Sequence, residues 1–321
     1  MQILDYDRAD WVQEEPVVIA LGNFDGVHLG HQQLLQKANA VSKEHGWESA
    51  VLLFKNHTTN VLAPSAKRVL TSVDDKKARL SRAGIDTIFL CTFNATFAAQ
   101  SKEVFIQKIL HRDLHVRHIV VGYDYRFGKG AEGSVKDLLK AEKDGLFSLS
   151  LIEDVRFEGK RISSTRIREA IAKGEVERAD AMLGAPYTIS GTVIHGAHRG
   201  HDLGYATANL GISFPYVLPH EGVYLTYARL KNWQGFGMTS VGTNPTFDDG
   251  SKMTIETNLF NFNETIYEQP MQLSFLRFER FNVRYHDKEA LIRQLKEDDR
   301  LLRSWAEEWK QTRSTFINEM R

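Results

Sequence analysis

The sequence predicts an α/β protein of two domains. The first, residues 1–184, is expected to be a doubly wound parallel sheet, and the second, residues 185–321, a small antiparallel β-barrel with a terminal helix. Three observations predict this. The chain has 321 residues, which is long for one domain. Short apolar runs alternate with helical patterns in the first half. In the second half, strand candidates follow one another with only turns between them.

The amino-terminal half contains five short apolar runs, most of them rich in β-branched residues. Such runs are typical of strands that are covered on both faces of a parallel sheet. They occupy residues 17–21, 50–54, 86–90, 118–122 and 147–152. Ligands of a doubly wound sheet bind at the carboxyl ends of its strands. Residues that follow these runs are therefore the first candidates for a site.

Helices are expected between the strands. The first should bury one face and stop at Gly46, and Ser101 and Ser134 are suitable N-caps for later helices. The residues of that buried face are Leu34, Leu35, Ala38 and Val41.

After residue 184 the pattern changes to short strands separated by Gly, Pro and Asn turns. The strand candidates are residues 187–194, 222–230, 237–242, 253–260 and 271–278. Many short strands without helices between them predict a small antiparallel barrel. Residues 288–317 are helical in pattern. Their apolar stripe, expected to pack on the barrel, consists of Leu291, Ile292, Leu295, Leu302, Trp305 and Trp309.

The composition argues against several classes of protein. Lys and Arg number 41 and Asp and Glu also number 41, so no global positive field attracts nucleic acid or an anionic membrane. The single cysteine, Cys91, excludes an internal disulfide and a thiol-rich zinc site. The acidic first 15 residues are unlike a signal peptide, and no apolar run approaches the roughly 20 residues needed to cross a bilayer. We expect a cytoplasmic protein that holds any polyanionic ligand at a local site.

The first candidate site is LGNFDGVHLGHQQLL, residues 21–35, which leads from the first strand into the first helix. Gly22 and Gly26 allow a close turn. His28 and His31, with Gly30 between them, can both face the helix N-terminus. Free N–H groups at a helix start attract phosphate, and imidazoles add donors. The alternative is a surface turn with solvated histidines.

Two further segments could hold a nucleotide. In ISSTRIREAI, residues 162–171, hydroxyl side chains precede Arg166 and Arg168, which suits a pyrophosphate clamp or simply an N-capped amphipathic helix. In VGYDYRFGKGAEGS, residues 121–134, Asp124 and Arg126 lie in a glycine-rich loop after a strand. Alone, that loop is a weak signal.

Together, and in this order, the motifs resemble the nucleotidyltransferase superfamily built around H-x-G-H and S-S-T-x-x-R. They are most similar to the prokaryotic bifunctional riboflavin kinase/FAD synthetase family, with a divergent kinase module. The resemblance covers essentially the whole chain. It implies transfer of AMP from ATP to FMN, which gives FAD and pyrophosphate, with Mg²⁺ brought by the substrate. An FMN phosphate is largely ionised at neutral pH, since its second pKa is about 6, so no strong base is required.

The resemblance also implies residue roles in the first domain. His28, His31 and Arg166 are the expected catalytic residues. The residues expected to bind ATP are Gly22, Asn23, Phe24, Asp25, Gly30, Ser163, Ser164, Thr165 and Arg168. Those expected at the flavin or its covering loop are His57, Asp124 and Arg126. His57 is followed by Thr58 where the family usually has proline.

The second domain resembles the riboflavin kinase module, which phosphorylates the ribityl 5′-hydroxyl of riboflavin with ATP. In GHDLGYATANL, residues 200–210, Thr207 and Asn209 match the family's threonine and asparagine for Mg²⁺–nucleotide binding. Glu256 matches the glutamate that takes the hydroxyl proton. An alcohol nucleophile benefits from such a carboxylate. Without the resemblance, Glu256 reads as a solvent-facing strand residue.

This second module departs from the family pattern more than the first. Ala206 stands in place of proline, which removes a fixed φ, and His201 replaces the usual arginine. Asn261 replaces aspartate, Glu268 glycine and Asn282 glutamate, whereas Arg280 fits. The asymmetry predicts intact FMN adenylylation with riboflavin phosphorylation reduced or lost. The alternatives are a single-function FAD synthetase, a flavin-binding regulatory protein, or a nucleotidyltransferase with another acceptor.

Overall fold

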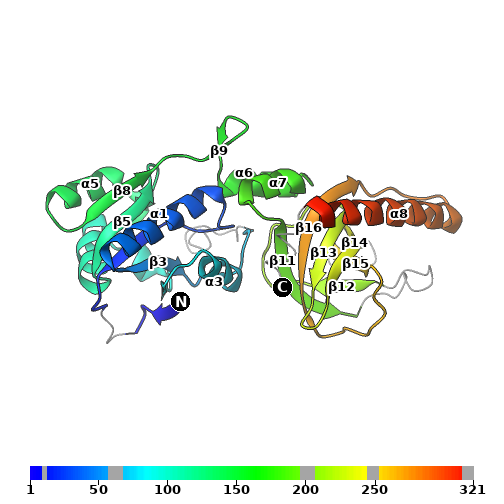
Figure 1. Ribbon diagram of the computed structural model, residues 1–321, viewed down its shortest axis with the longest axis horizontal. Helices are drawn as coiled ribbons and strands as arrows, with labels where there is room; N and C mark the ends of the chain where they lie inside the picture. Colours follow the sequence, from blue (N-terminus) through cyan, green and yellow to red (C-terminus); the bar gives the residue numbers. More distant parts are fainter. Residues whose placement is uncertain (9–12, 57–67, 196–206, 244–252, 313–321) are drawn as a thin grey trace. The chain divides into compact units, whose positions relative to one another are not determined.

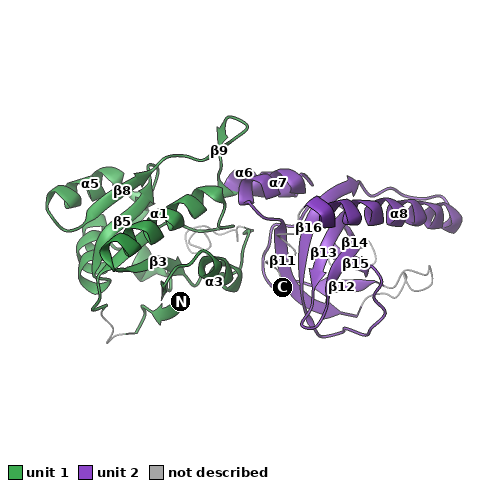
Figure 2. Ribbon diagram, in the orientation of Figure 1, with its two compact units in different colours: residues 1–164 green, residues 165–321 purple. Residues whose placement is uncertain are grey.

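The computed structural model describes residues 1–8, 13–56, 68–195, 207–243 and 253–312 (Figure 1). The chain forms two compact units, Met1–Ser164 and Thr165–Arg321 (Figure 2). The expected boundary at residue 184 lies after helices α6 (Ser164–Ala172) and α7 (Val176–Leu183). Helix α7 contacts strands of the second unit, and this is why the chain divides earlier than the sequence pattern indicated.

The first unit is built on a six-stranded sheet in the order β1-β4-β3-β2-β5-β8, with all pairs parallel. This confirms the predicted doubly wound parallel sheet. The strands are β1 (Gln2–Asp5), β2 (Val17–Leu21), β3 (Glu48–Phe54), β4 (Thr87–Cys91), β5 (Val116–Gly122) and β8 (Ser148–Ile152). Strand β1 was not predicted. It is a short, half-exposed edge strand, so its four residues carry no apolar run.

Residues of β2 alternate between two fully apolar layers. Val18 and Ala20 pack with α1 (Leu29–His45) and α3 (Val73–Arg82), and Ile19 packs on the opposite layer. That layer contains the π-helical segment η1 (Val104–Asp113) and α5 (Val135–Lys143). The predicted apolar face of α1 is buried, and α1 ends at Gly46, whose φ of +69° is left-handed.

The strand order changes direction at β2, which lies between β3 and β5. At such a switch point the loops after the two central strands diverge and leave a crevice for ligands. The loops concerned follow β2 and β5, and both were singled out from the sequence. Shorter elements of this unit are α4 (Ala95–Ala98), η2 (Lys129–Ala131), β6 (Arg126–Phe127), β7 (Gly133–Ser134), β9 (Arg156–Phe157) and β10 (Lys160–Arg161).

The second unit contains a closed six-stranded antiparallel barrel in the order β11-β12-β15-β14-β13-β16, as predicted. The strands are β11 (Tyr187–Ile194), β12 (Ala208–Gly211), β13 (Gly222–Arg229), β14 (Gln234–Thr243), β15 (Met253–Leu259) and β16 (Pro270–Arg280). Closure leaves these strands without an unpaired edge.

Helix α8 (Lys288–Thr312) packs on the outside of β13 and β14. Leu302 is buried there, and Leu295, Trp305 and Trp309 pack around it, which confirms most of the predicted stripe. Leu291 and Ile292 are partly exposed. Among the described residues, no helix has the length and apolar character required to cross a membrane.

The barrel also contains a buried chain of hydroxyl groups. Thr239 Oγ1 lies 2.7 Å from Thr226 Oγ1 and 2.9 Å from Thr257 Oγ1, and all three side chains are fully buried. Each hydroxyl can donate one hydrogen bond and accept another, so a chain of this kind satisfies its members without solvent.

Candidate active sites

The loop that joins β2 to α1 adopts a backbone that glycine alone adopts without cost. Gly26 has φ +86°, but Phe24 (+48°) and Val27 (+44°) are also left-handed, and both side chains are buried. Positive φ is rare for a β-branched residue and costs on the order of 1–3 kcal/mol at each position. The surrounding structure must therefore hold this loop in place.

Asp25 supplies several of those restraints. Its carboxylate is 1% exposed, and Oδ1 accepts from the N–H groups of Leu70 (2.9 Å) and Thr71 (3.2 Å). Thr71 Oγ1 in turn accepts from Gly26 N–H at 2.9 Å. The Ser164 hydroxyl donates to the Asp25 carbonyl at 2.9 Å, although the two residues are 139 apart in sequence. Asp25 was expected to bind ATP, and in the structure its carboxylate binds residues 70 and 71 and so fixes the loop.

His28 and His31 lie together at the start of α1. Their rings stack with centroids 3.7 Å apart, and the Phe24 ring packs on His31. His28 is the N-cap, since its Nδ1 accepts from the His31 N–H at 3.3 Å. Because Nδ1 accepts, the proton of the neutral His28 ring is on Nε2, which is thus a donor. The sequence predicted that both imidazoles can face the helix start, and the structure places both rings there.

Both imidazoles are neutral at pH 7. Burial, reinforced by the Arg161 charge and opposed by Asp25, lowers the pKa of His28 to about 4. Burial, then the charges of His28, Lys76 and Arg161, holds the pKa of His31 well below its ordinary value. Among the described residues, His31 Nδ1 is buried and has no hydrogen-bond partner. The pair therefore offers neutral hydrogen-bonding groups to a ligand.

Two glycines of the motif leave room at the histidine pair. A Cβ on Gly30 would lie 3.2 Å from both Nδ1 and Cε1 of His28, and one on Gly22 would lie 3.7 Å from His31 Cδ2. Asn23 is exposed at the outer side of the loop. A side chain at Gly30 would thus displace the His28 ring.

Sequence reasoning missed the cation beside this loop. Arg161 pairs with Asp124 at 2.6 Å and with Asp154 at 3.0 Å. The hydrogen bond from Arg161 lowers the pKa of Asp124. Asp124 is thus held by an arginine that also influences His28, whereas Arg126 is exposed. Arg161 directly precedes the 162–171 motif, and its position there was the available signal.

The remaining residues expected at this site fall in different parts of the chain. Ser163 is partly exposed. Thr165, Arg166 and Arg168 belong to α6 in the second unit, where Arg168 Nη1 donates to Thr165 Oγ1 at 3.4 Å. His57 and Thr58 lie outside the described residues.

The three residues expected for phosphorylation share one face of the barrel. Asn209 on β12 is directly opposite Glu256 on β15. Directly opposed residues have Cβ atoms about 5 Å apart and point to the same side. Thr207 is two positions before Asn209, which in an extended chain places it on that side too. All three are partly exposed, whereas the intervening Ala208 is buried.

This donor set fits Mg²⁺. Hydroxyl, amide and carboxylate oxygens suit a hard cation, and Mg²⁺ usually takes few protein ligands together with substrate phosphates. In the described part of the chain, no group of three or more His, Cys, Asp or Glu side chains could hold a metal ion. A nucleotide-bound cation needs no such group.

Several residues of the second unit differ from the family pattern, and the structure shows the local surroundings of Glu268, Asn261 and Asn282. Glu268 has φ +65°, a conformation in which glycine costs least, and Asn261 has φ +56°, which asparagine tolerates. Asn282 Nδ2 donates to the Val241 carbonyl at 2.9 Å. Arg280 is held by Asp298 of α8 at 2.6 Å. His201 and Ala206 lie outside the described residues.

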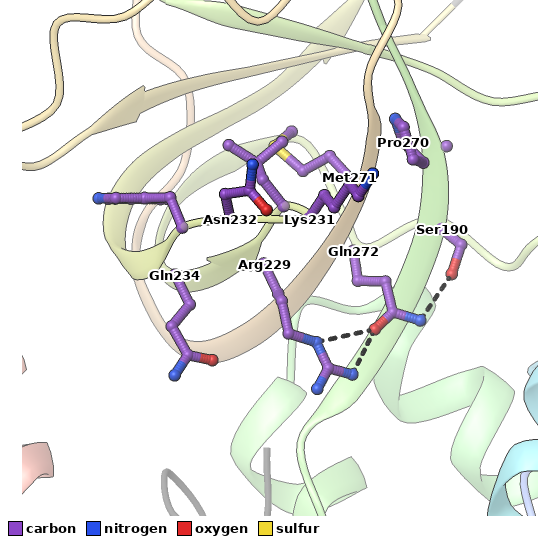
Figure 3. A pocket seen from close by; sticks show the side chains of 11 residues that line it. Ser190, Arg229, Lys231, Asn232, Gln234, Pro270, Met271 and Gln272 are labelled. Carbon is purple, nitrogen blue, oxygen red and sulfur yellow. Dashed lines mark hydrogen bonds between the residues drawn. The ribbon is translucent and has the colours of Figure 1, made fainter. Parts of the chain in front are cut away.

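A separate hollow of about 770 Å³ lies at the β13–β14 turn of the barrel (Figure 3). Arg229 donates to Gln272 Oε1 at 2.7 Å, and Gln272 reaches Ser190 at 3.4 Å (Figure 3). None of the residues expected at either site lines it.

Comparison with known proteins identifies a match for each half. Residues 11–166 match the family model for FAD synthetase, and residues 183–306 that for riboflavin kinase. The chain is 38% identical to the bifunctional riboflavin kinase/FMN adenylyltransferase of Listeria monocytogenes, over 90% of this chain and 92% of that protein. It is 34% identical to the protein of the same name from Bacillus subtilis, over 88% and 90%.

A solved structure is also similar over nearly its whole length. The crystal structure described as a macrolide-efflux protein from Streptococcus pneumoniae has a TM-score of 0.86 and 31% identity, covering 94% of this chain and 99% of that one. The comparisons thus confirm the resemblance found in the motifs. They give no support to a single-function enzyme or to a regulatory protein.

Proposed function

The chain belongs to the bifunctional riboflavin kinase/FMN adenylyltransferase family, and we propose that it makes FAD from riboflavin in two ATP-dependent steps. The barrel unit transfers phosphate from ATP to riboflavin, and the sheet unit transfers AMP from a second ATP to the FMN formed. One observation carries the proposal: each family match falls almost entirely within one unit, and the fold of that unit suits the reaction. Substrates of this kind fit the cytoplasmic location expected from the sequence.

In adenylyl transfer, an FMN phosphate oxygen attacks the α-phosphorus of ATP and pyrophosphate leaves. The nucleophile is already ionised, so the protein's task is alignment and stabilisation of charge. We assign His28 Nε2–H and the His31 imidazole to the ATP phosphates, with the N–H groups at the start of α1. We assign the triphosphate and leaving group to Ser163, Ser164, Thr165, Arg166 and Arg168.

Other residues of the first site shape it around the ligands. Gly22 and Gly30 let the phosphates approach the backbone, while Phe24 and Asp25 fix the loop and leave Asn23 at its surface. We assign the covering of the flavin nucleotide to His57, Asp124 and Arg126. In this proposal Arg161 adds positive charge beside the histidine pair.

In riboflavin phosphorylation the nucleophile is an alcohol, which needs to lose a proton. Glu256 is the proposed base, and Thr207 and Asn209 on the same face would hold Mg²⁺ together with the ATP phosphates. Bound Mg²⁺ would offset phosphate charge as it is transferred. The alignment of Asn209 with Glu256 supports this assignment.

Two variants test the two sites separately. Changing both His28 and His31 to alanine should abolish FAD formation from FMN and leave FMN formation from riboflavin unaffected. Glu256→Gln should do the reverse. Products are separated by chromatography after incubation with ATP and Mg²⁺. Undiminished FAD output from the folded histidine variant would refute the first assignment. Absence of FMN formation by the wild-type protein would refute the second activity.

A further inference from the structure

Helix α3 touches the strained loop after β2 with two cationic side chains. Lys76 Nζ donates to the Asn23 carbonyl at 3.3 Å, and Arg79 Nη1 donates to the Gly26 carbonyl at 3.3 Å. Lys76 is only 7% exposed, which is unusual for a lysine. The side chains are three residues apart, so they project from one face of the helix and reach two carbonyls of one loop.

Helix α3 is itself firmly placed. Ser72 and Asp75 form a capping box at its start, with Asp75 Oδ2 accepting from the Ser72 hydroxyl at 2.7 Å. Leu80 anchors its other end in the core below the sheet and is fully buried. Thr71, which directly precedes the N-cap of α3, hydrogen-bonds to both Asp25 and Gly26. The loop between β2 and α1 is thus hydrogen-bonded to a helix that is itself held in place.

Lys76 and Arg79 bind the loop next to its residues with positive φ. Asn23 precedes Phe24, and Gly26 precedes Val27, the two non-glycine residues of this loop with positive φ. A strained conformation persists only where neighbouring groups determine it. Each cation holds the carbonyl just before one of these residues and so opposes relaxation of the loop.

We propose that Lys76 and Arg79 are positioning residues for adenylyl transfer, holding the loop so that His28 and His31 are presented to the ATP phosphates. The inference rests on the proposed function of the sheet unit. Neither residue was singled out by the sequence motifs.

Lys76 also influences His31 through its charge. Burial is the largest cause that disfavours the protonated form of the His31 imidazole, and the charges of His28 beside it, Lys76 of α3 and Arg161 add to this effect. Loss of the Lys76 charge should therefore raise the pKa of His31 toward its ordinary value. A residue that only packed against the loop would not have this effect.

The experiment uses the full chain with Lys76→Met, Lys76→Gln and Arg79→Met. Lys77→Met and Arg82→Met are matched controls from the same helix: Lys77 pairs with Asp74, and Arg82 is exposed. FAD formation from FMN is measured with ATP varied, riboflavin phosphorylation is measured in the same samples, and the His31 pKa is followed by NMR. Wild-type conversion of FMN to FAD is established first, so its absence would count against the proposed function itself.

We expect Lys76→Met and Arg79→Met to lower kcat/KM for ATP by about 10-fold to 100-fold, as loss of a charged hydrogen bond implies. Lys76→Gln, which keeps a donor without the charge, should lose less, and both Lys76 variants should raise the His31 pKa. Controls should match the wild type. The inference is overturned if Lys76→Met transfers AMP normally, leaves the His31 pKa unchanged, or loses riboflavin phosphorylation in parallel.

Discussion

Replacing His28 by asparagine separates the two tasks of this side chain. In the structure, Nδ1 caps α1 and Nε2–H is the donor assigned to phosphate. Asparagine is among the best N-cap residues, so the helix start is kept, and the lost stacking on His31 should cost about 1 kcal/mol independently of pH. The donor is lost, so kcat/KM for adenylyl transfer should fall by about 10-fold to 100-fold.

The same substitution should change how stability depends on pH. The folded pKa of His28 is about 4, whereas its ordinary value is 6.5. The unfolded chain therefore binds the proton more tightly, and the contribution of His28 to stability is complete above pH 6.5 and is lost as the pH falls toward 4. Between pH 7 and pH 5 this loss amounts to about 2 kcal/mol. Asparagine does not titrate, so the His28→Asn variant should not lose this stability.

Urea unfolding at the two pH values measures this effect, with hydrogen exchange of the β2 peptide, residues 17–21, reporting on the first unit alone. Comparing His28→Asn with wild type at each pH cancels the titrating groups that do not interact with His28. The difference should move by about 2 kcal/mol in favour of the variant at pH 5. A difference that stays constant would show that His28 is not held neutral by burial. His45→Asn, at the exposed far end of α1, is the matched control.

Three further substitutions test the barrel unit, each by urea unfolding followed through the tryptophans of α8. Asp298→Ala removes the carboxylate that binds the largely buried Arg280 at 2.6 Å and leaves it the Glu279 carboxylate at 3.2 Å; it should cost about 3 kcal/mol, and a cost below 1 kcal/mol would refute the importance of the pair. Thr239→Val removes the middle hydroxyl of the buried chain and should cost about 1–3 kcal/mol, and unchanged stability would mean that its partners find other bonds. Glu268→Gly relieves a left-handed φ of +65° and should stabilise by about 1 kcal/mol, so destabilisation would contradict the strain assigned there.

The strands and the first helix could be predicted because their signals are local. Five apolar runs match β2, β3, β4, β5 and β8 to within two residues, and Gly46 does end α1. Strand β1 could not be found, since its place is set by pairing with β4, more than 80 residues away. The burial of Asp298 on the apolar stripe of α8 depends on Arg280 in another element, and no periodicity shows such a pair.

In the candidate sites, too, local features could be predicted and contacts between distant segments could not. The spacing of His28 and His31 was enough to place both imidazoles at the helix start, because one helix turn decides it, but the stacking of the two rings was not predicted. Glycines in the motif correctly marked a tight turn, but the strain falls mostly on Phe24 and Val27, and no local pattern points to either residue. Lys76 lies on a different helix, and only the packing of α3 under the loop brings it there.

A carboxylate near the nucleophile would hinder the first proposed reaction, adenylyl transfer, and assist the second, riboflavin phosphorylation. The two units differ in how they hold their carboxylates. An FMN phosphate is already an anion, so a carboxylate facing it would repel it. In the sheet unit Asp25 is 1% exposed, with Oδ1 bound to backbone N–H groups, and the charges beside the histidines come from Lys76 and Arg161. Riboflavin brings a neutral hydroxyl, for which a carboxylate is an asset, and Glu256 on β15 is partly exposed. In the sheet unit Asp25 is thus enclosed and the exposed Asp124 is paired with Arg161, whereas in the barrel unit Glu256 is accessible.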